Sequence, residues 1–194
     1  MRSERIRVLA LIGAALPLAG CDWGTSVDLS NQSGNTVAEQ IRQIASEEGF
    51  SRPGRWETTI TLKQVDATGV PAAALANIKA GVGKPQKAAT CLDKEAIRRG
   101  AFYVGEENAA CRYDRFSMGH GKIQGTLRCV DAAGTRAMTM SGSYGPDRYE
   151  LLVTTDVQSS QPQAAGKASV TMAMNAKRVG ECLGTEDKLP PGMR

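Results

Sequence analysis

The sequence is poor in the residues from which most active sites are built. It contains a single histidine, His120, and no Gly-x-Ser-x-Gly motif. His120 stands between two glycines, which is typical of a solvated turn, whereas a catalytic imidazole has to be held in place by its neighbours. The acidic residues Glu106 and Glu107 are adjacent in sequence, which is typical of a solvated surface. We therefore predict that the protein is not an enzyme.

Sequence patterns that mark metal sites and nucleic-acid interfaces are also missing. No Cys-x-x-Cys pair is present, so zinc binding has no support. No run of five or more lysines and arginines occurs and the formal net charge is only +4, whereas strong binding to nucleic acid needs clustered cations. Aromatic residues make up 5% of the chain, so aliphatic residues and methionine must form most of the core. We expect no cofactor, no metal and no nucleic-acid partner.

The N-terminal segment has the pattern of a bacterial export signal. Three arginines precede the apolar stretch 8–18, which is too short to cross a bilayer as a helix. The sequence Leu-Ala-Gly-Cys over residues 18–21 follows and resembles the lipobox of bacterial lipoproteins. We predict that residues 1–20 are a signal peptide and that lipid on Cys21 anchors the protein to a membrane of the cell envelope, facing the periplasm. Asp22 resembles a retention signal that favours the inner membrane, and an ordinary secretory signal is the alternative.

The rest of the chain is predicted to divide into a tether, one domain and a short tail. Residues 21–35 are small and polar, as in a flexible tether. Residues 36–184 are expected to form a single domain that opens with a helix over 36–48, and capping-box spacing predicts that this helix starts at Thr36. Residues 185–194 are expected to fray.

Alternating apolar and polar residues predict that the domain is mainly β. Within residues 55–65, Trp56, Ile60 and Leu62 share one face of a strand. Further strands are expected over residues 111–118, 122–130, 135–143, 148–157 and 168–178, separated by turn residues. The fold class is therefore mainly β (α+β), with an antiparallel meander of about six strands forming an open barrel or sandwich.

The segment over residues 66–90 is long for a plain loop, which makes it a candidate lid or mobile insert. One or two helical turns are predicted within it, over residues 72–79. Asp93 has the position of an N-cap for a short helix that ends at Gly100.

The cysteines predict two disulfide bonds. Lipidation of Cys21 would leave four cysteines, and an even number in an exported protein favours pairing. In a hairpin centred on its turn, Cys111 lies opposite Cys129, whereas Cys129 and Cys182 are expected at opposite ends of the meander. The preferred pairing is Cys111–Cys129 with Cys91–Cys182, and the alternative is Cys91–Cys111 with Cys129–Cys182.

Several short elements occur together in an order that resembles domain-of-unknown-function family 3617. They are Arg52-Pro53-Gly54-Arg55-Trp56-Glu57, Cys91-Leu92-Asp93-Lys94-Glu95, Cys111, Cys129 and Gly180-Glu181-Cys182. The resemblance covers about residues 50–183. It implies a short proteobacterial envelope protein, of a kind that is often a lipoprotein. It implies no activity, cofactor or catalytic residue, because none is established for the family.

Candidate ligand-facing residues are those expected on the inward side of the sheet. They are Trp56, Tyr113, Arg115, Met138, Met140, Met172 and Met174. The methionines form two pairs, each on one face of a strand, where thioethers either pack an irregular core or bind Cu(I). Arg115 shares the face of Tyr113, so either the strand bulges there or the interior holds a guanidinium that would meet an anionic ligand.

These patterns favour a lipid-anchored binding or interaction module. The first hypothesis is that a cupped sheet holds a small apolar or amphipathic ligand. The second is a protein without a pocket that docks an unknown envelope protein through an exposed strand edge or through residues 66–90. A Cu(I)-binding methionine protein is the less favoured third hypothesis.

Overall fold

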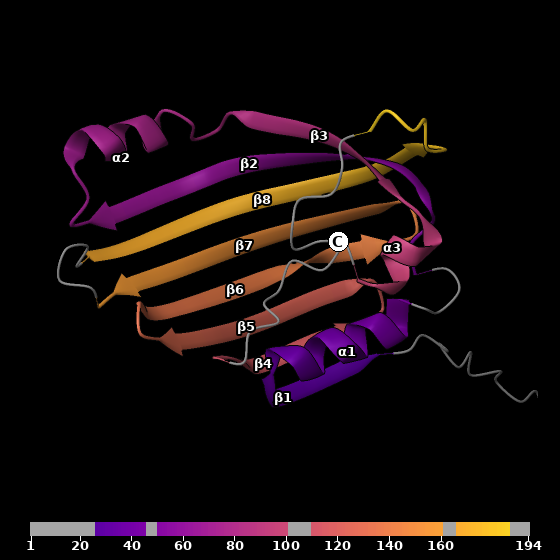
Figure 1. The fold of residues 1–194 in the computed structure, drawn as a ribbon, viewed down its shortest axis with the longest axis horizontal. Coiled ribbons are helices and arrows are strands. Elements are labelled where there is room, and N and C mark those ends of the chain that lie inside the picture. Colours follow the sequence, from indigo (N-terminus) through magenta and orange to yellow (C-terminus); the bar gives the residue numbers. More distant parts are fainter. Residues whose placement is uncertain (1–25, 46–49, 101–109, 161–165, 187–194) are drawn as a thin grey trace, which may run out of the picture.

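The computed structural model describes residues 26–45, 50–100, 110–160 and 166–186, and it shows one large antiparallel sheet with three short helices (Figure 1). In chain order the elements are β1 (Val27–Ser33), α1 (Gly34–Ala45), β2 (Gly54–Thr68), α2 (Ala72–Lys79), β3 (Pro85–Leu92), α3 (Lys94–Arg98), β4 (Cys111–Gly119), β5 (Lys122–Asp131), β6 (Gly134–Gly145), β7 (Arg148–Ser159) and β8 (Gly166–Gly180).

The strands of the described residues form an open sheet in the order β1-β4-β5-β6-β7-β8-β2-β3. Every neighbouring pair is antiparallel. Strands β4 to β8 follow one another as the predicted meander. Strand β1 pairs with β4 on one side, and the β2–β3 hairpin pairs with β8 on the other. The predicted fold class is confirmed, with eight strands in place of about six.

Two of the strands lie where the sequence predicted none. Part of the predicted tether is β1, because Val27 and Leu29 turn toward the core while Asp28 and Ser30 face outward. Part of the predicted lid is β3, an alanine-rich edge strand that pairs with β2 along its whole length. The tether prediction is therefore wrong for residues 27–33, and the lid prediction is wrong for residues 85–90.

The helices are close to their predicted positions. Helix α1 begins earlier than expected, because Ser33 caps it: the Thr36 amide donates to Ser33 Oγ at 3.2 Å. Glu39, the predicted partner in a capping box, instead pairs with Arg42 at 3.2 Å. Helices α2 and α3 are confirmed, and the Asp93 carboxylate caps α3 by accepting from the Ala96 amide at 2.7 Å. The predicted end of the first helix, residues 46–48, lies outside the described residues.

Helices α1 and α3 lie on the same face of the sheet, and each belongs to a connection between strands on different sides of the sheet. Strands β1 and β2 lie on opposite sides of the meander, so the chain carrying α1 has to cross one face between them. The chain carrying α3 leads back from β3 toward β4. Helix α1 packs on β1, β4 and α3, and Figure 1 shows both helices in front of the sheet. We call this the inner face and the opposite one the outer face.

The core lies between α1 and the inner face. Apolar residues of the helix pack against apolar residues of β4, β5, β6 and β7. The cluster includes Val37, Ile41, Ile44, Tyr113, Phe116, Leu127, Met140, Leu151 and Val153. A second, smaller cluster surrounds Trp56 and joins β2 and β3 to α3. The scarcity of aromatic residues is thus met by a core of aliphatic side chains and methionine.

Both preferred disulfides are confirmed. Cys111 and Cys129 are register partners in the β4–β5 hairpin, with Cα atoms 4.0 Å apart. Cys91 and Cys182 join β3 to the chain that follows β8, with Cα atoms 5.4 Å apart. Because β2 lies between β3 and β8, the second bond ties together the two neighbours of β2.

Candidate functional site

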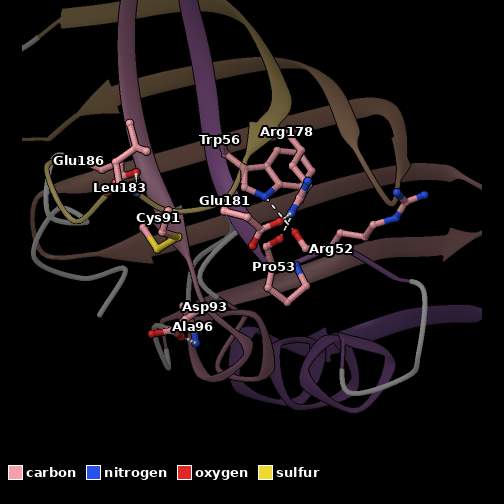
Figure 2. The surroundings of a disulfide bond; sticks show 11 residues. Arg52, Pro53, Trp56, Cys91, Asp93, Ala96, Arg178, Glu181, Leu183 and Glu186 are labelled. Carbon is pink, nitrogen blue, oxygen red and sulfur yellow. Dashed lines mark hydrogen bonds and ion pairs between the residues drawn. A yellow bond between two sulfur atoms is a disulfide. The ribbon is translucent and has the colours of Figure 1, made fainter.

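The Pro-Gly-x-Trp-Glu motif builds the point where β2 begins beside the end of β8 (Figure 2). Gly54 has a φ of +144°, and a Cβ there would lie 2.4 Å from the Gly180 carbonyl oxygen. Arg178 lies across this contact: its Nε donates to the Pro53 carbonyl at 2.7 Å, and its guanidinium also pairs with Glu181. Only glycine combines this φ with so close an approach.

Trp56 is the apolar anchor of the same corner. Its side chain is 2% exposed, and its indole N–H donates to the Arg52 carbonyl at 3.1 Å. The indole stacks on Tyr149, with ring centroids 6.1 Å apart. Burial raises the pKa of Tyr149 above its usual value of 10.0, while a hydrogen bond with Thr58 acts in the opposite direction. Trp56 is therefore a packed side chain, held on both its apolar and its polar side.

A small apolar cavity borders this corner under α1. It has a volume of about 40 Å³, and Ile41, Phe50, Trp56 and Leu151 are among its lining residues. For comparison, an engineered apolar cavity that binds benzene has a volume of about 150 Å³, so this one is too small for a ring of that size. The end of the inner face that α1 covers is therefore filled by side chains.

The Cys-x-Asp-x-Glu element also has structural partners. Cys91 is in the disulfide to Cys182, Asp93 caps α3, and Glu95 pairs with Arg98 on the exposed side of that helix. The motif residues thus fix a disulfide, a helix start and a close strand contact. The site for a ligand has to be sought elsewhere on the molecule.

The other end of the inner face carries a half-exposed apolar surface, which we call the inner patch. Six partly buried or exposed side chains of β2, β6 and β8 form it: Ile60, Leu62, Met138, Val170, Met172 and Met174. Among the described residues, no helix makes an extensive contact with β6, β7 or β8. Helices α1 and α3 lie over the opposite end, so none of the described helices covers this patch.

The strand register shows how the methionines of the inner patch are arranged. Met172 lies between Val153 of β7 and Leu62 of β2, and Met174 lies between Leu151 and Ile60 in the next row. Met138 is the register partner of Thr155 in β7, and Thr155 is in turn the partner of Val170 in β8. Strand β7 thus separates the two methionine pairs by two strand spacings, or about 9.6 Å. A continuous apolar surface describes this arrangement better than a compact thioether cluster.

Met140 belongs to the core rather than to the patch. It is 3% exposed, and a Cβ at Gly125 would lie 3.1 Å from its Cγ, so Met140 fills the space that this glycine leaves. Tyr113 is completely buried, with its ring edge-on to Phe116.

Arg115 was predicted on the inward side, and the structure places it on the outer face. The β4–β5 register shifts between Tyr113 and Arg115, so the strand bulges, which was one of the two interpretations. Arg115 consequently points to solvent and pairs with Asp28 of β1 at 3.1 Å. The prediction that Arg115 lies on the inward side of the sheet is therefore wrong.

A large surface hollow differs in character from the inner patch. It has a volume of about 860 Å³ and spans β2, β3, β7 and β8. Charged residues from all four strands line it, with Glu57 opposite Lys177 and Lys177 opposite Arg148. This hollow is open and polar, so it offers an apolar ligand little surface to bury.

Groups of three or more metal-ligating His, Cys, Asp or Glu side chains were not found within the described ranges. None of the helices described is long and apolar enough to cross a membrane. His120 sits in the β4–β5 turn with a φ of +49°, as its glycine neighbours predicted. Cys21 and Asp22 lie outside the described residues, so lipid anchoring stays a prediction.

Sequence reasoning found the methionines but not the whole surface to which they belong. Ile60 and Leu62 were expected on the same strand face as Trp56, and they lie there, yet Ile60 is 37% exposed whereas Trp56 is 2% exposed. The missing signal was the position of β2 beside β8, because only that pairing joins these residues to Met172 and Met174. The local periodicity of a segment indicates a strand and its buried face, but it does not indicate which strand will lie beside it in the sheet.

Comparison with known proteins gives one match. A family model described as a protein of unknown function (DUF3617) matches residues 51–182. No curated protein and no solved structure matches the chain.

Proposed function

The chain belongs to the DUF3617 family of unknown function, and we propose that it is a binding module whose inner patch holds a small apolar or amphipathic ligand. The observation that carries this proposal is the division of the inner face into two ends. One end is covered by α1 and filled, whereas the other exposes apolar side chains on several adjacent strands.

The chemistry of the patch suits a flexible apolar ligand. Three of its six side chains are methionines, whose unbranched thioethers adapt to ligands of different shape. Burial of each aliphatic or methionine side chain is worth roughly 1.5–3 kcal/mol at most, so contact with a few of them supports micromolar binding. Thr155, which lies between Met138 and Val170 in the strand register, would donate or accept a hydrogen bond with a polar end of the ligand.

The proposal is tested with the neutral apolar fluorophore N-phenyl-1-naphthylamine and the purified full-length chain. We expect saturable binding with an increase in emission. Met172→Gln and Ile60→Thr are each expected to weaken binding about tenfold, because each removes an apolar contact worth roughly 1.4 kcal/mol. Ile60→Thr keeps a β-branched residue in the strand, which protects the fold.

The matched control is Leu152→Gln. Leu152 is an exposed apolar strand residue, 46% exposed, but it lies on the outer face of β7. Its substitution should leave the affinity unchanged. Equal affinities for the wild type and for both patch variants, with thermal unfolding showing that the variants are folded, would contradict the proposal.

Partner docking is the second candidate function, and the open sheet supports it. Strand β3 forms one edge of the sheet, and its residues Pro85 to Ala88 are exposed. An exposed edge offers unpaired backbone groups to a strand of another protein. Absence of fluorophore binding, together with crosslinking of an envelope protein through β3, would favour docking over ligand binding.

We also propose that the module is anchored through lipid on Cys21 and faces the periplasm. The support is the export pattern of residues 1–21. Globomycin, which blocks lipoprotein signal cleavage, should make the precursor accumulate in the producing cell. Cys21→Ser should release the protein from the membrane fraction, and unchanged processing and partitioning would contradict the anchor.

A further inference from the structure

The connection between β2 and β3 projects from the sheet as an apolar tip. Helix α2 lies at its end, at the upper left of Figure 1, and it has no buried residue. Val70, just before the helix, is 39% exposed, and Ile78 within it is 47% exposed. An isolated apolar residue on a surface needs no explanation, but here the whole helix consists of alanine, leucine, isoleucine, one asparagine and one lysine.

Within the chain segment that forms this tip, the charge has one sign. No aspartate or glutamate occurs from Ala67 through Leu92, although the chain as a whole has 20 acidic residues. The lysines of the same stretch, Lys79, Lys84 and Lys87, are all exposed. The tip therefore combines exposed apolar side chains with cations and carries no opposing charge of its own.

We propose that the tip formed by residues 69–84 contacts the surface of an anionic lipid bilayer. Apolar side chains would enter the boundary between headgroups and acyl chains, while the lysines remain among the anionic headgroups. Burial of the apolar residues and attraction of the cations to the headgroups each give only weak binding alone. Their free energies add, so the two together bind the surface more strongly. A protein groove would bury the apolar residues equally well but would not explain the exclusion of acids over the whole stretch.

The position of the tip connects it to the inner patch. Helix α2 follows the end of β2, and Thr68 at this end pairs with Lys167 at the start of β8. This is the end of the inner face that α1 leaves without cover. A bilayer at the tip would place the inner patch near the source of amphipathic molecules, but the tip itself can bind lipid whether or not the patch binds a ligand.

The test uses tryptophan fluorescence of the full-length chain with vesicles of phosphatidylcholine and phosphatidylglycerol, part of the former brominated. Ile78→Trp puts a reporter on α2, and Leu152→Trp puts a control reporter of similar exposure on the outer face. Trp56 is buried, and the unsubstituted chain supplies the baseline for the native tryptophans. We expect bromine quenching above this baseline for Ile78→Trp alone.

The charge contribution is tested in the Ile78→Trp background. Lys79→Gln combined with Lys84→Gln should weaken partitioning into the anionic vesicles about thirtyfold, since each lysine adds about 1 kcal/mol near such a surface. Equal quenching of the two reporters would overturn the proposal. Quenching that is the same in vesicles without phosphatidylglycerol would overturn it as well, as would insensitivity to the two lysine substitutions.

Discussion

At Gly54 the backbone leaves no room for a side chain. The residue has a φ of +144°, and a Cβ would meet both the Gly180 carbonyl oxygen at 2.4 Å and Arg178 Nε at 2.7 Å. Gly54→Ala should therefore destabilise the fold by about 2–4 kcal/mol, from backbone strain and from displacement of Arg178. Chemical denaturation monitored by circular dichroism measures this loss.

A second glycine serves as the control for this substitution. Gly145, at the end of β6, has no heavy atom within 4 Å of a Cβ built on it, and its φ lies outside the left-handed region. Gly145→Ala should change the stability by no more than about 0.5 kcal/mol. If Gly54→Ala had as small an effect, the close approach of β2 and β8 would not constrain this position.

At the level of single residues, sequence reasoning succeeded where the cause is local. The cap at Asp93 and the turn at His120 follow from side-chain chemistry within a few residues, and both are present. The pairing of Cys111 with Cys129 follows from the symmetry of a hairpin about its turn. Arg115 was misplaced because a bulge inserts one residue, and every side chain beyond it then changes face.

Among the elements, the long alternating strands were predictable and the edge strands were not. Strand β2 and the five strands of the meander have regular period-two patterns, which reflect one buried face. Strand β1 has only two inward apolar residues, and its extended backbone is interrupted at Asn31, whose φ is +54°. Strand β3 is largely exposed and rich in alanine, so burial imposes no alternation on it. Both edge strands form because a neighbouring strand offers backbone partners, a cause that lies outside their own sequence.

The candidate site depends on the same long-range information. The methionine pairs of β6 and β8 were visible in the sequence, but their union with Ile60 and Leu62 depends on the placement of the β2–β3 hairpin beside β8. The exposed tip at α2 was within a segment singled out for its length, yet its apolar character became informative only once the helix proved to be unburied. The local sequence pattern identified the apolar residues, but the order of the strands determines which of these residues share a surface.

For the whole molecule, the Cys91–Cys182 bond is the longest covalent constraint on the described chain. It closes a loop with a sequence separation of 91, which contains α3 and the entire meander β4 to β8. The Cys111–Cys129 bond closes a separation of only 18. If disulfides act mainly by restricting the unfolded chain, the long loop contributes about 4.5 kcal/mol and the short one about 3 kcal/mol.

Cys91→Ser combined with Cys182→Ser should therefore lower the unfolding free energy by about 4.5 kcal/mol while leaving the native sheet intact. Strand β3 remains paired with β2 along its length, and Cys182 lies on the exposed chain after β8, so few native contacts are lost. The constraint is removed from the unfolded state, which becomes more expanded, so the slope of the unfolding free energy against urea should also rise. Urea titration gives both quantities, and near-ultraviolet circular dichroism reports the Trp56–Tyr149 stack in the native state. An unchanged midpoint, or a native spectrum altered at this stack, would show that the bond acts on local structure instead of on chain entropy.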